Sequence, residues 1–136
     1  MDILTKEQRS EVMSMIRAQD TGPELVVRRA AHALGLRFRL HRRDLAGSPD
    51  LVFPRRRKAL FVHGCYWHRH EGCRFAYTPK SNVDFWMTKF ARNVERDNEA
   101  MARLRVAGWD PMVIWECETR QPERVVERLS AIIEAA

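Results

Sequence analysis

The sequence predicts an α/β fold, organised as one domain that spans residues 1–136. Apolar residues recur at intervals of three and four near both ends of the chain, which is the spacing of helices. Short runs typical of β-strands lie between these regions, and no linker divides the chain. A chain of this length can bury roughly two-thirds of its unfolded surface, which is enough for a sizeable core. With 45% hydrophobic and 31% charged residues, the composition suits a globular protein and argues against disorder.

Two helices are predicted in the first 35 residues. The first covers residues 5–18 and begins with the spacing of a capping box. The second repeats that spacing at Thr21 and Glu24, has a proline in its first turn and ends at Gly35. The buried stripe of this second helix is predicted to consist of Leu25, Val26, Ala30, Ala33 and Leu34.

Three short strands are expected next. The run LRFRLH alternates apolar and basic residues, DLVF follows a Gly-Ser-Pro turn, and KALFVHG follows the basic turn PRRR. Short strands joined by tight turns predict a β-meander.

The C-terminal half is predicted to be a long helix, a strand and a last helix. Apolar residues at helical spacing indicate the long helix over residues 82–107, with the aromatic residues of DFWMTKF mostly in the core. The run PMVIWE reads as a buried strand that ends at Cys117. Pro122 begins the last helix, whose core face is Val125, Val126, Leu129, Ile132 and Ile133.

The charge balance favours an anionic partner. Lys and Arg total 24 against 18 acidic residues, so the formal net charge is +6. Nucleic acid is the commonest partner of such a basic domain, although the excess can also serve solubility alone. The sequence shows no signal peptide and no run near the roughly 20 apolar residues that span a bilayer, so a cytoplasmic location is expected.

The segment HGCYWHRHEGC concentrates side chains that bind metals. Cys65, His70 and Cys73 have the spacing C-x4-H-x2-C, which lets three ligands from one loop meet a tetrahedral zinc ion. Cys117, the only other cysteine, could complete a Cys3His site. The alternative is that the thiols are small buried residues.

Two histidines of the same segment remain outside this set. His63 and His68 can act as general acid or base near neutral pH, which makes them the candidate catalytic residues. A purely structural role for either imidazole is the alternative.

Several motifs around these side chains resemble one protein family. In chain order they are D-T-G-P-E, S-P-D-L-V-F, LFVHGCYWHRH, KSNVDFW, NVERD and GWDPMVIWEC. Over about residues 10–117 the chain is similar to the very short patch repair endonucleases, the Vsr family. The resemblance implies a restriction-endonuclease-like fold related to the PD-(D/E)xK nucleases, with a mixed central β-sheet flanked by helices and a structural zinc site. It also implies magnesium-dependent nicking of duplex DNA beside a thymine-guanine mismatch.

The resemblance also assigns roles to single residues. Asp50 matches the metal-binding aspartate, His63 and His68 match the catalytic histidines, and Glu24 matches an acidic residue near the active site. The residues that match the zinc ligands are Cys65, His70, Cys73 and Cys117. Those that match side chains entering the DNA stack beside the mismatch are Tyr66, Trp67 and, from the N-terminal helix, Met13.

Two positions depart from the family pattern. Val62 stands where some members have threonine, and its main-chain carbonyl can still bind a hard cation. The zinc loop is one residue longer, with Glu71 and Gly72 before the last loop ligand.

These assignments predict a mechanism in which Asp50 and the Val62 carbonyl hold Mg²⁺ on the scissile phosphate. His68 then acts as the base for water and His63 as a phosphate ligand or acid, and the two histidine roles could be exchanged. Glu24 orients metal-bound water or merely caps its helix.

Duplex DNA, expected to be mismatched, is the predicted partner of a monomer, and mismatch-repair proteins are further candidate partners. Two alternatives remain open: a nicking or restriction-type nuclease with little mismatch preference, and a zinc-stabilised DNA-binding module without catalysis.

Overall fold

A computed structural model describes residues 21–134. The helix predicted over residues 5–18, and Met13 with it, lies outside the described residues. In chain order the elements are α2 (Gly22–Ala33), β1 (Arg39–Leu40), β2 (Leu51–Phe53), the short 3-10 turn η1 (Pro54–Arg56), β3 (Lys58–His63), α3 (Val83–Val106), β4 (Asp110–Trp115), α4 (Glu116–Thr119) and α5 (Pro122–Glu134).

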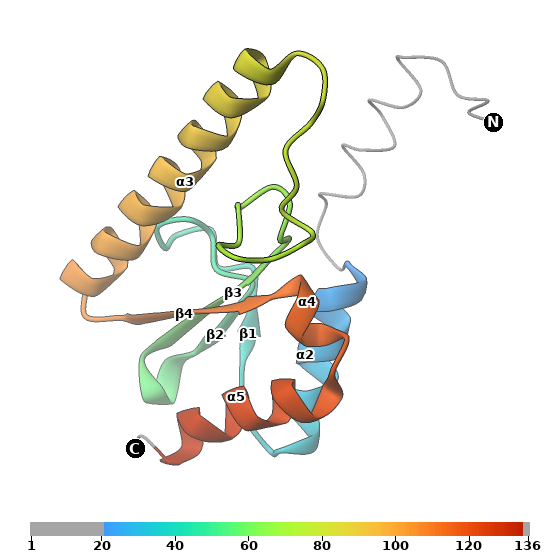
Figure 1. Ribbon diagram of the computed structural model, residues 1–136. Helices are drawn as coiled ribbons and strands as arrows, with labels where there is room; N and C mark the ends of the chain where they lie inside the picture. Colours follow the sequence, from blue (N-terminus) through green and yellow to red (C-terminus); the bar gives the residue numbers. More distant parts are fainter. Residues whose placement is uncertain (1–20, 135–136) are drawn as a thin grey trace.

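The four strands form one mixed sheet in the order β1-β2-β3-β4. The first three pair antiparallel, which confirms the predicted meander. β4 runs parallel to β3, and the chain between them includes α3. This crossover places α3 against one face of the sheet, while α2 and α5 cover the other face (Figure 1).

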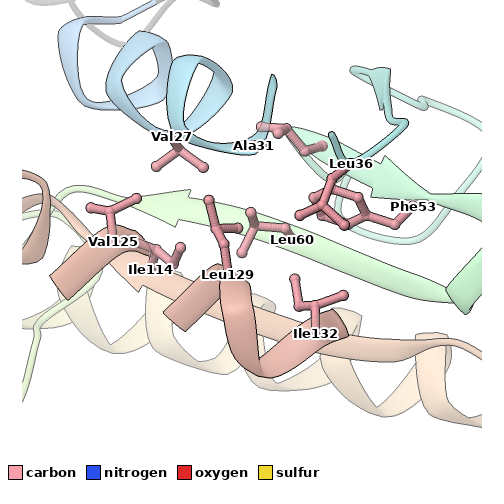
Figure 2. Close-up of a cluster of buried hydrophobic side chains, with 10 residues drawn as sticks. Val27, Ala31, Leu36, Phe53, Leu60, Ile114, Val125, Leu129 and Ile132 are labelled. Carbon is pink, nitrogen blue, oxygen red and sulfur yellow. The ribbon is translucent and has the colours of Figure 1, made fainter. Parts of the chain in front are cut away.

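Alternation along the strands divides the core into two layers. Leu51, Phe53 and Leu60 belong to the larger cluster of buried side chains. Figure 2 shows Phe53 and Leu60 packed with residues of α2 and α5. Val52 and Phe61, one residue out of step, face α3 instead. Because successive strand residues point to opposite faces, buried runs such as LVF supply both layers at once.

The second predicted helix exists, but its buried stripe lies slightly to one side of the expected one. Val27 and Ala31 are fully buried, whereas Ala33, which was expected to be buried, is exposed. The last helix follows its prediction except at Val126, which is 40% exposed. In both helices, the buried side chains lie along the line where α2 contacts α5 and the sheet.

The long helix is confirmed as α3, yet the prediction that the aromatic residues of DFWMTKF are mostly core is wrong. Phe90 is buried, but Phe85 is 61% exposed. The first turns of α3 extend beyond the sheet, which therefore does not cover them (Figure 1). None of the helices within residues 21–134 is long and apolar enough to cross a membrane.

The turn before β2 packs closely on α3. Gly47 has a φ of +74°, and a Cβ added there would lie 2.8 Å from the Cβ of Ala100. Glycine is therefore required by both the backbone conformation and the space. This close approach fixes the position of Asp50, three residues further on.

Candidate active site

Asp50 lies where β2 begins beside the end of β3. The antiparallel register pairs Leu51 with Leu60, so Asp50 falls next to the last residues of β3. Its Oδ2 accepts a hydrogen bond from the main-chain N–H of Val62 at 2.7 Å. The carboxylate is thereby fixed beside the residue whose carbonyl was predicted to share its cation.

One cleft contains most of the predicted catalytic side chains. It lies between the sheet end and α3, and its lining includes Asp50, Val62, His63, His68, Asn93, Arg96 and Asp97. The first four come from the sheet end and the loop after it, and the last three come from one face of α3. The structure therefore brings together Asp50 and both predicted histidines.

The environment of Asp50 destabilises an unpaired negative charge. Burial, with a contribution from the Glu24 carboxylate, raises its pKa to about 6, against the opposing effects of the Val62 N–H, His41 and His68. A carboxylate desolvated in this way binds a cation in place of a proton. The position thus suits a metal ligand.

His63 and His68 stack on each other with ring centroids 3.8 Å apart and planes 6° apart. Burial, assisted by His68, lowers the pKa of His63 to about 3, so this imidazole is neutral at physiological pH. His63 also touches the rings of Phe61 and Trp115, which hold it in place. It is therefore suited to donate a hydrogen bond from a neutral ring rather than a proton from an imidazolium.

His68 has a carboxylate partner that the sequence reading missed. Its Nδ1 lies 2.6 Å from Oδ2 of Asp97 on α3. This contact assigns the proton to Nδ1 and leaves the Nε2 lone pair available. The NVERD motif contains Asp97, but nothing in the motif alone indicates that it faces His68.

His63, His68 and Asp97 also place ligand-type atoms within 4.8 Å of one another. The two imidazoles are parallel, however, so their nitrogen lone pairs run side by side and do not converge on one ion. This group is therefore better suited to proton transfer than to metal binding.

Glu24 lies on α2 with its side chain directed toward the same sheet end. Thr21 caps the helix as predicted, since its Oγ1 accepts from the Glu24 N–H at 3.4 Å. The Glu24 carboxylate pairs with Arg28 at 2.8 Å and with Nε2 of His41. His41 was missed because the basic run HRRD, residues 41–44, is typical of a solvated face or of phosphate contacts.

The four predicted zinc ligands meet at one point. The ligand atoms of Cys65, His70, Cys73 and Cys117 all lie within 4.8 Å of one another. His70 Nδ1 is 3.7 Å from the Cys65 sulfur and 3.4 Å from the Cys117 sulfur. Two ligands of one tetrahedral zinc ion are separated by about 3.5–3.8 Å, so this cluster could hold zinc.

The zinc loop and the C-terminal region support this cluster from two sides. Cys117 does not end a strand as predicted but lies in the short helix α4, because Glu118 accepts the main-chain N–H of Trp115 and starts a helical turn. Arg128 of α5 binds the Glu118 carboxylate at 2.8 Å. The Trp115 ring stacks on His70 at 4.2 Å. These contacts orient two of the four ligands before a metal binds.

Tyr66 and Trp67 are half-buried members of an aromatic cluster between the zinc loop and α3. The cluster consists of Tyr66, Trp67, Tyr77, Phe85, Trp86 and Phe90. Arg69 fixes the loop by donating to the carbonyls of Tyr66, Ala76 and Tyr77. Its guanidinium lies over the Phe90 ring at 4.1 Å. Neither Tyr66 nor Trp67 is in the protein core.

An imidazole with a free nitrogen beside a carboxylate suited to a cation can hydrolyse a phosphate ester. The net charge of +6 fits a nucleic acid as the source of that ester. The fold and the cleft thus define a protein of the nuclease class.

Comparison with known proteins gives the family. The profile of DNA mismatch endonuclease Vsr matches residues 1–74. The type II nicking enzyme V.XorIIP of Xanthomonas oryzae pv. oryzae is 46% identical over 133 residues, which cover 98% of this chain and 97% of that protein. The DNA mismatch endonuclease Vsr of Escherichia coli K12 is 36% identical over 126 residues, which cover 93% of this chain and 80% of that protein.

A further relative is the type II nicking enzyme V.NmeAIP of Neisseria meningitidis serogroup A, which is 37% identical over 132 residues, or 97% of this chain and 94% of that protein. The chain belongs to the Vsr family and is a DNA endonuclease. The predicted resemblance and the predicted enzyme class are confirmed, and the alternative of a DNA-binding module without catalysis is not supported.

Proposed function

We propose that this endonuclease nicks one strand of duplex DNA beside a thymine-guanine mismatch, in very short patch mismatch repair, with Mg²⁺ bound at Asp50. The observation that carries the proposal is the cleft in which Asp50 and the His68–Asp97 pair face one space. The mixed sheet flanked by helices supports a restriction-endonuclease-like fold formed as one domain.

The metal would be held by Asp50 and the main-chain carbonyl of Val62, with Glu24 nearby. Asp50 and Val62 offer oxygen atoms, the ligands that Mg²⁺ prefers. Water and phosphate oxygens can fill the remaining positions of the ion. When bound, Mg²⁺ neutralises charge on the scissile phosphate and assists the leaving oxygen. Within residues 21–134, the buried Asp50 carboxylate hydrogen-bonds to the Val62 N–H and to no Lys or Arg side chain. Its negative charge is therefore available to a cation.

Proton transfer falls to the two imidazoles. His68 accepts the proton of the attacking water at Nε2, while Asp97 holds its Nδ1–H and stabilises the charge that develops on the ring. The His68 side chain is 31% exposed, so water can reach it, whereas His63 is only 6% exposed. Neutral His63 then donates a hydrogen bond to a phosphate oxygen. These environments favour His68 as the base over the exchanged assignment.

The partnership of Asp97 with His68 can be tested directly. Asp97→Asn is expected to lower the single-turnover nicking rate about 10- to 100-fold, the usual effect of losing a carboxylate that orients an imidazole. DNA affinity should stay the same, because Asp97 contacts His68 and not the DNA in this mechanism. The control is Glu99→Gln, which removes an exposed carboxylate from the same helix. Equal rates for the two variants would exclude the proposed role of Asp97.

Mismatch preference is assigned to Tyr66 and Trp67. Separating a base step costs a few kcal/mol, less where pairing is already poor, and stacking an aromatic ring on a base returns about 1–3 kcal/mol. Mispaired DNA is therefore easier to open for these rings. Asn93 binds the Trp67 carbonyl at 3.3 Å and ties this loop to α3, the helix that carries Asp97.

The double variant Tyr66→Ala with Trp67→Ala should lose more nicking on a thymine-guanine duplex than on paired DNA. The aromatic pair Tyr66→Phe with Trp67→Phe serves as the control and should retain most of the preference, because both rings remain. Zinc content and the circular dichroism spectrum should stay unchanged in both variants. Equal losses on the two substrates would show that the two rings support the structure in general and do not provide the mismatch preference.

The names of two relatives support cleavage of one strand. The relatives from Xanthomonas and Neisseria are named nicking enzymes, without reference to a mismatch. A nicking enzyme with little mismatch preference is therefore the second candidate function. The same pair of substrates separates the two, since this candidate predicts similar rates on both.

A further inference from the structure

We propose that His41 is a metal ligand: together with Glu24 and Asp50 it forms a divalent-cation site, and its imidazole makes that site favour Mn²⁺ over Mg²⁺. The inference rests on the proposed function, which places a cation at Asp50, and it extends that function to the choice of metal.

The three side chains come from separate segments that converge. Glu24 lies in the first turn of α2, His41 directly follows β1, and Asp50 directly precedes β2. Each offers a ligand atom, and these atoms lie within 4.8 Å of one another. His41 Nε2 hydrogen-bonds to Oε1 of Glu24 and lies 3.4 Å from Nη2 of Arg28, so a cation bound here replaces the proton shared with Glu24. Nitrogen and oxygen donors at such separations can bind one cation.

A main-chain hydrogen bond holds His41 and Asp50 next to each other. The main-chain N–H of His41 donates to the carbonyl of Asp50 at 3.1 Å. His41 has a φ of 48°, in the left-handed region that non-glycine residues rarely adopt. This conformation ends β1 and, with the contact to Glu24, places the imidazole beside the two carboxylates.

The local charge favours a divalent ion. Glu24 and Asp50 carry two formal negative charges, and an imidazole that ligates a metal adds none. Arg28 lies 2.8 Å from the Glu24 carboxylate and supplies one positive charge on that side. These four side chains therefore retain one net negative charge. The Glu24 side chain is only 4% exposed, so water screens that charge weakly.

The donor set indicates which divalent ion is preferred. Mg²⁺ favours oxygen ligands and retains much of its water, whereas first-row transition ions bind imidazole nitrogen more readily. Mn²⁺ also accepts carboxylate and water ligands in the octahedral geometry of Mg²⁺. A site of two carboxylates and one imidazole thus accepts both ions, with the nitrogen ligand favouring Mn²⁺.

The test compares the affinities for Mn²⁺ and Mg²⁺ of the zinc-loaded full chain, without DNA, by calorimetry and by electron paramagnetic resonance of free Mn²⁺. His41→Asn removes the imidazole, while asparagine tolerates the left-handed backbone better than most residues. The variant should lose about tenfold or more in Mn²⁺ affinity and little in Mg²⁺ affinity. The control His32→Asn removes an exposed imidazole from α2 and should bind both ions like the wild type.

Unchanged Mn²⁺ affinity in His41→Asn, or equal losses for both ions, would overturn the inference, because a structural effect does not discriminate between metals. Glu24→Gln provides a second variant if His41→Asn fails to fold, and it should weaken both ions. Because no DNA is present, the result is independent of nicking. If His41→Asn selectively loses Mn²⁺ affinity but the wild-type enzyme does not nick mismatched DNA, the proposed function is refuted and the assignment of His41 as a metal ligand stands.

Discussion

Asp50→Asn is expected to lower the nicking rate at least about a thousandfold, because a bound metal contributes several kcal/mol to stabilising the transition state. The fold should survive. Asparagine is nearly isosteric, and its amide oxygen can still accept the Val62 N–H that Oδ2 accepts at 2.7 Å. Loss of the charge also relieves a carboxylate that burial disfavours.

Nicking and DNA binding should therefore separate in this variant. Gel-shift affinity for duplex DNA should stay within about threefold of the wild type, since phosphate contacts by basic residues supply most of that affinity. Asp44→Asn is the matched control, because Asp44 is an exposed aspartate that pairs with Arg42 in the preceding turn. Near-normal nicking by Asp50→Asn with Mg²⁺ would refute the assignment of Asp50 as metal ligand.

Cys117→Ser is expected to remove zinc and to destabilise the whole domain by about 3 kcal/mol or more, because binding of a structural zinc contributes directly to folding. Cys117 joins α4 to the loop that carries the other three ligands, 44 or more positions earlier in the sequence. Burial raises the pKa of the Cys65 thiol to about 12, so that thiol ionises readily only when a cation replaces its proton. Without a metal, α4 loses this link to the loop that carries the other three ligands.

Zinc content by elemental analysis and the urea midpoint of unfolding measure this effect. Wild-type protein stripped with a chelator should show the same lowered midpoint as Cys117→Ser. Glu116→Gln alters the neighbouring residue of α4 and should leave both quantities unchanged. Cys117→Ser protein that keeps one zinc ion per chain and the wild-type midpoint would contradict a structural Cys3His site.

The sequence predicted the elements well, because they depend on local patterns. The meander from β1 to β3, the helix α3 and the helix α5 all follow from periodicity and turn residues. The end of β4 was misplaced because α4 starts there, where Glu118 accepts the main-chain N–H of Trp115. Arg128 of α5 supports the Glu118 carboxylate from ten residues further along the chain, and that contact leaves no local signal.

The residues missed at the site share the same cause. Asp97 belongs to a charged helix face, and His41 belongs to a basic turn, so each looks like a solvated residue in the sequence. Their partners, His68 and Glu24, are 29 and 17 residues away along the chain. Only the packing of α3 and α2 on opposite faces of the sheet brings these pairs together (Figure 1).

The aromatic residues of α3 show the opposite error. Helical spacing predicted that Phe85 and Trp86 are core residues, yet the helix extends beyond the sheet at this end. Periodicity identifies an apolar face but not what covers it. In this chain that face joins the zinc loop and leaves Phe85 and Tyr77 largely exposed.

The most direct test of mismatch-specific nicking is the nicking rate, with Mg²⁺, on labelled duplexes of one sequence that carry each mismatch or perfect pairing. The thymine-guanine duplex should be cut on one strand at least about tenfold faster than the paired duplex, as expected if poor pairing lowers the cost of opening the stack by more than about 1.4 kcal/mol. The Asp50→Asn variant should cut none of them at a comparable rate. Equal cutting of paired and mismatched duplexes, or cutting by Asp50→Asn at the wild-type rate, would contradict a mismatch endonuclease whose metal is held by Asp50.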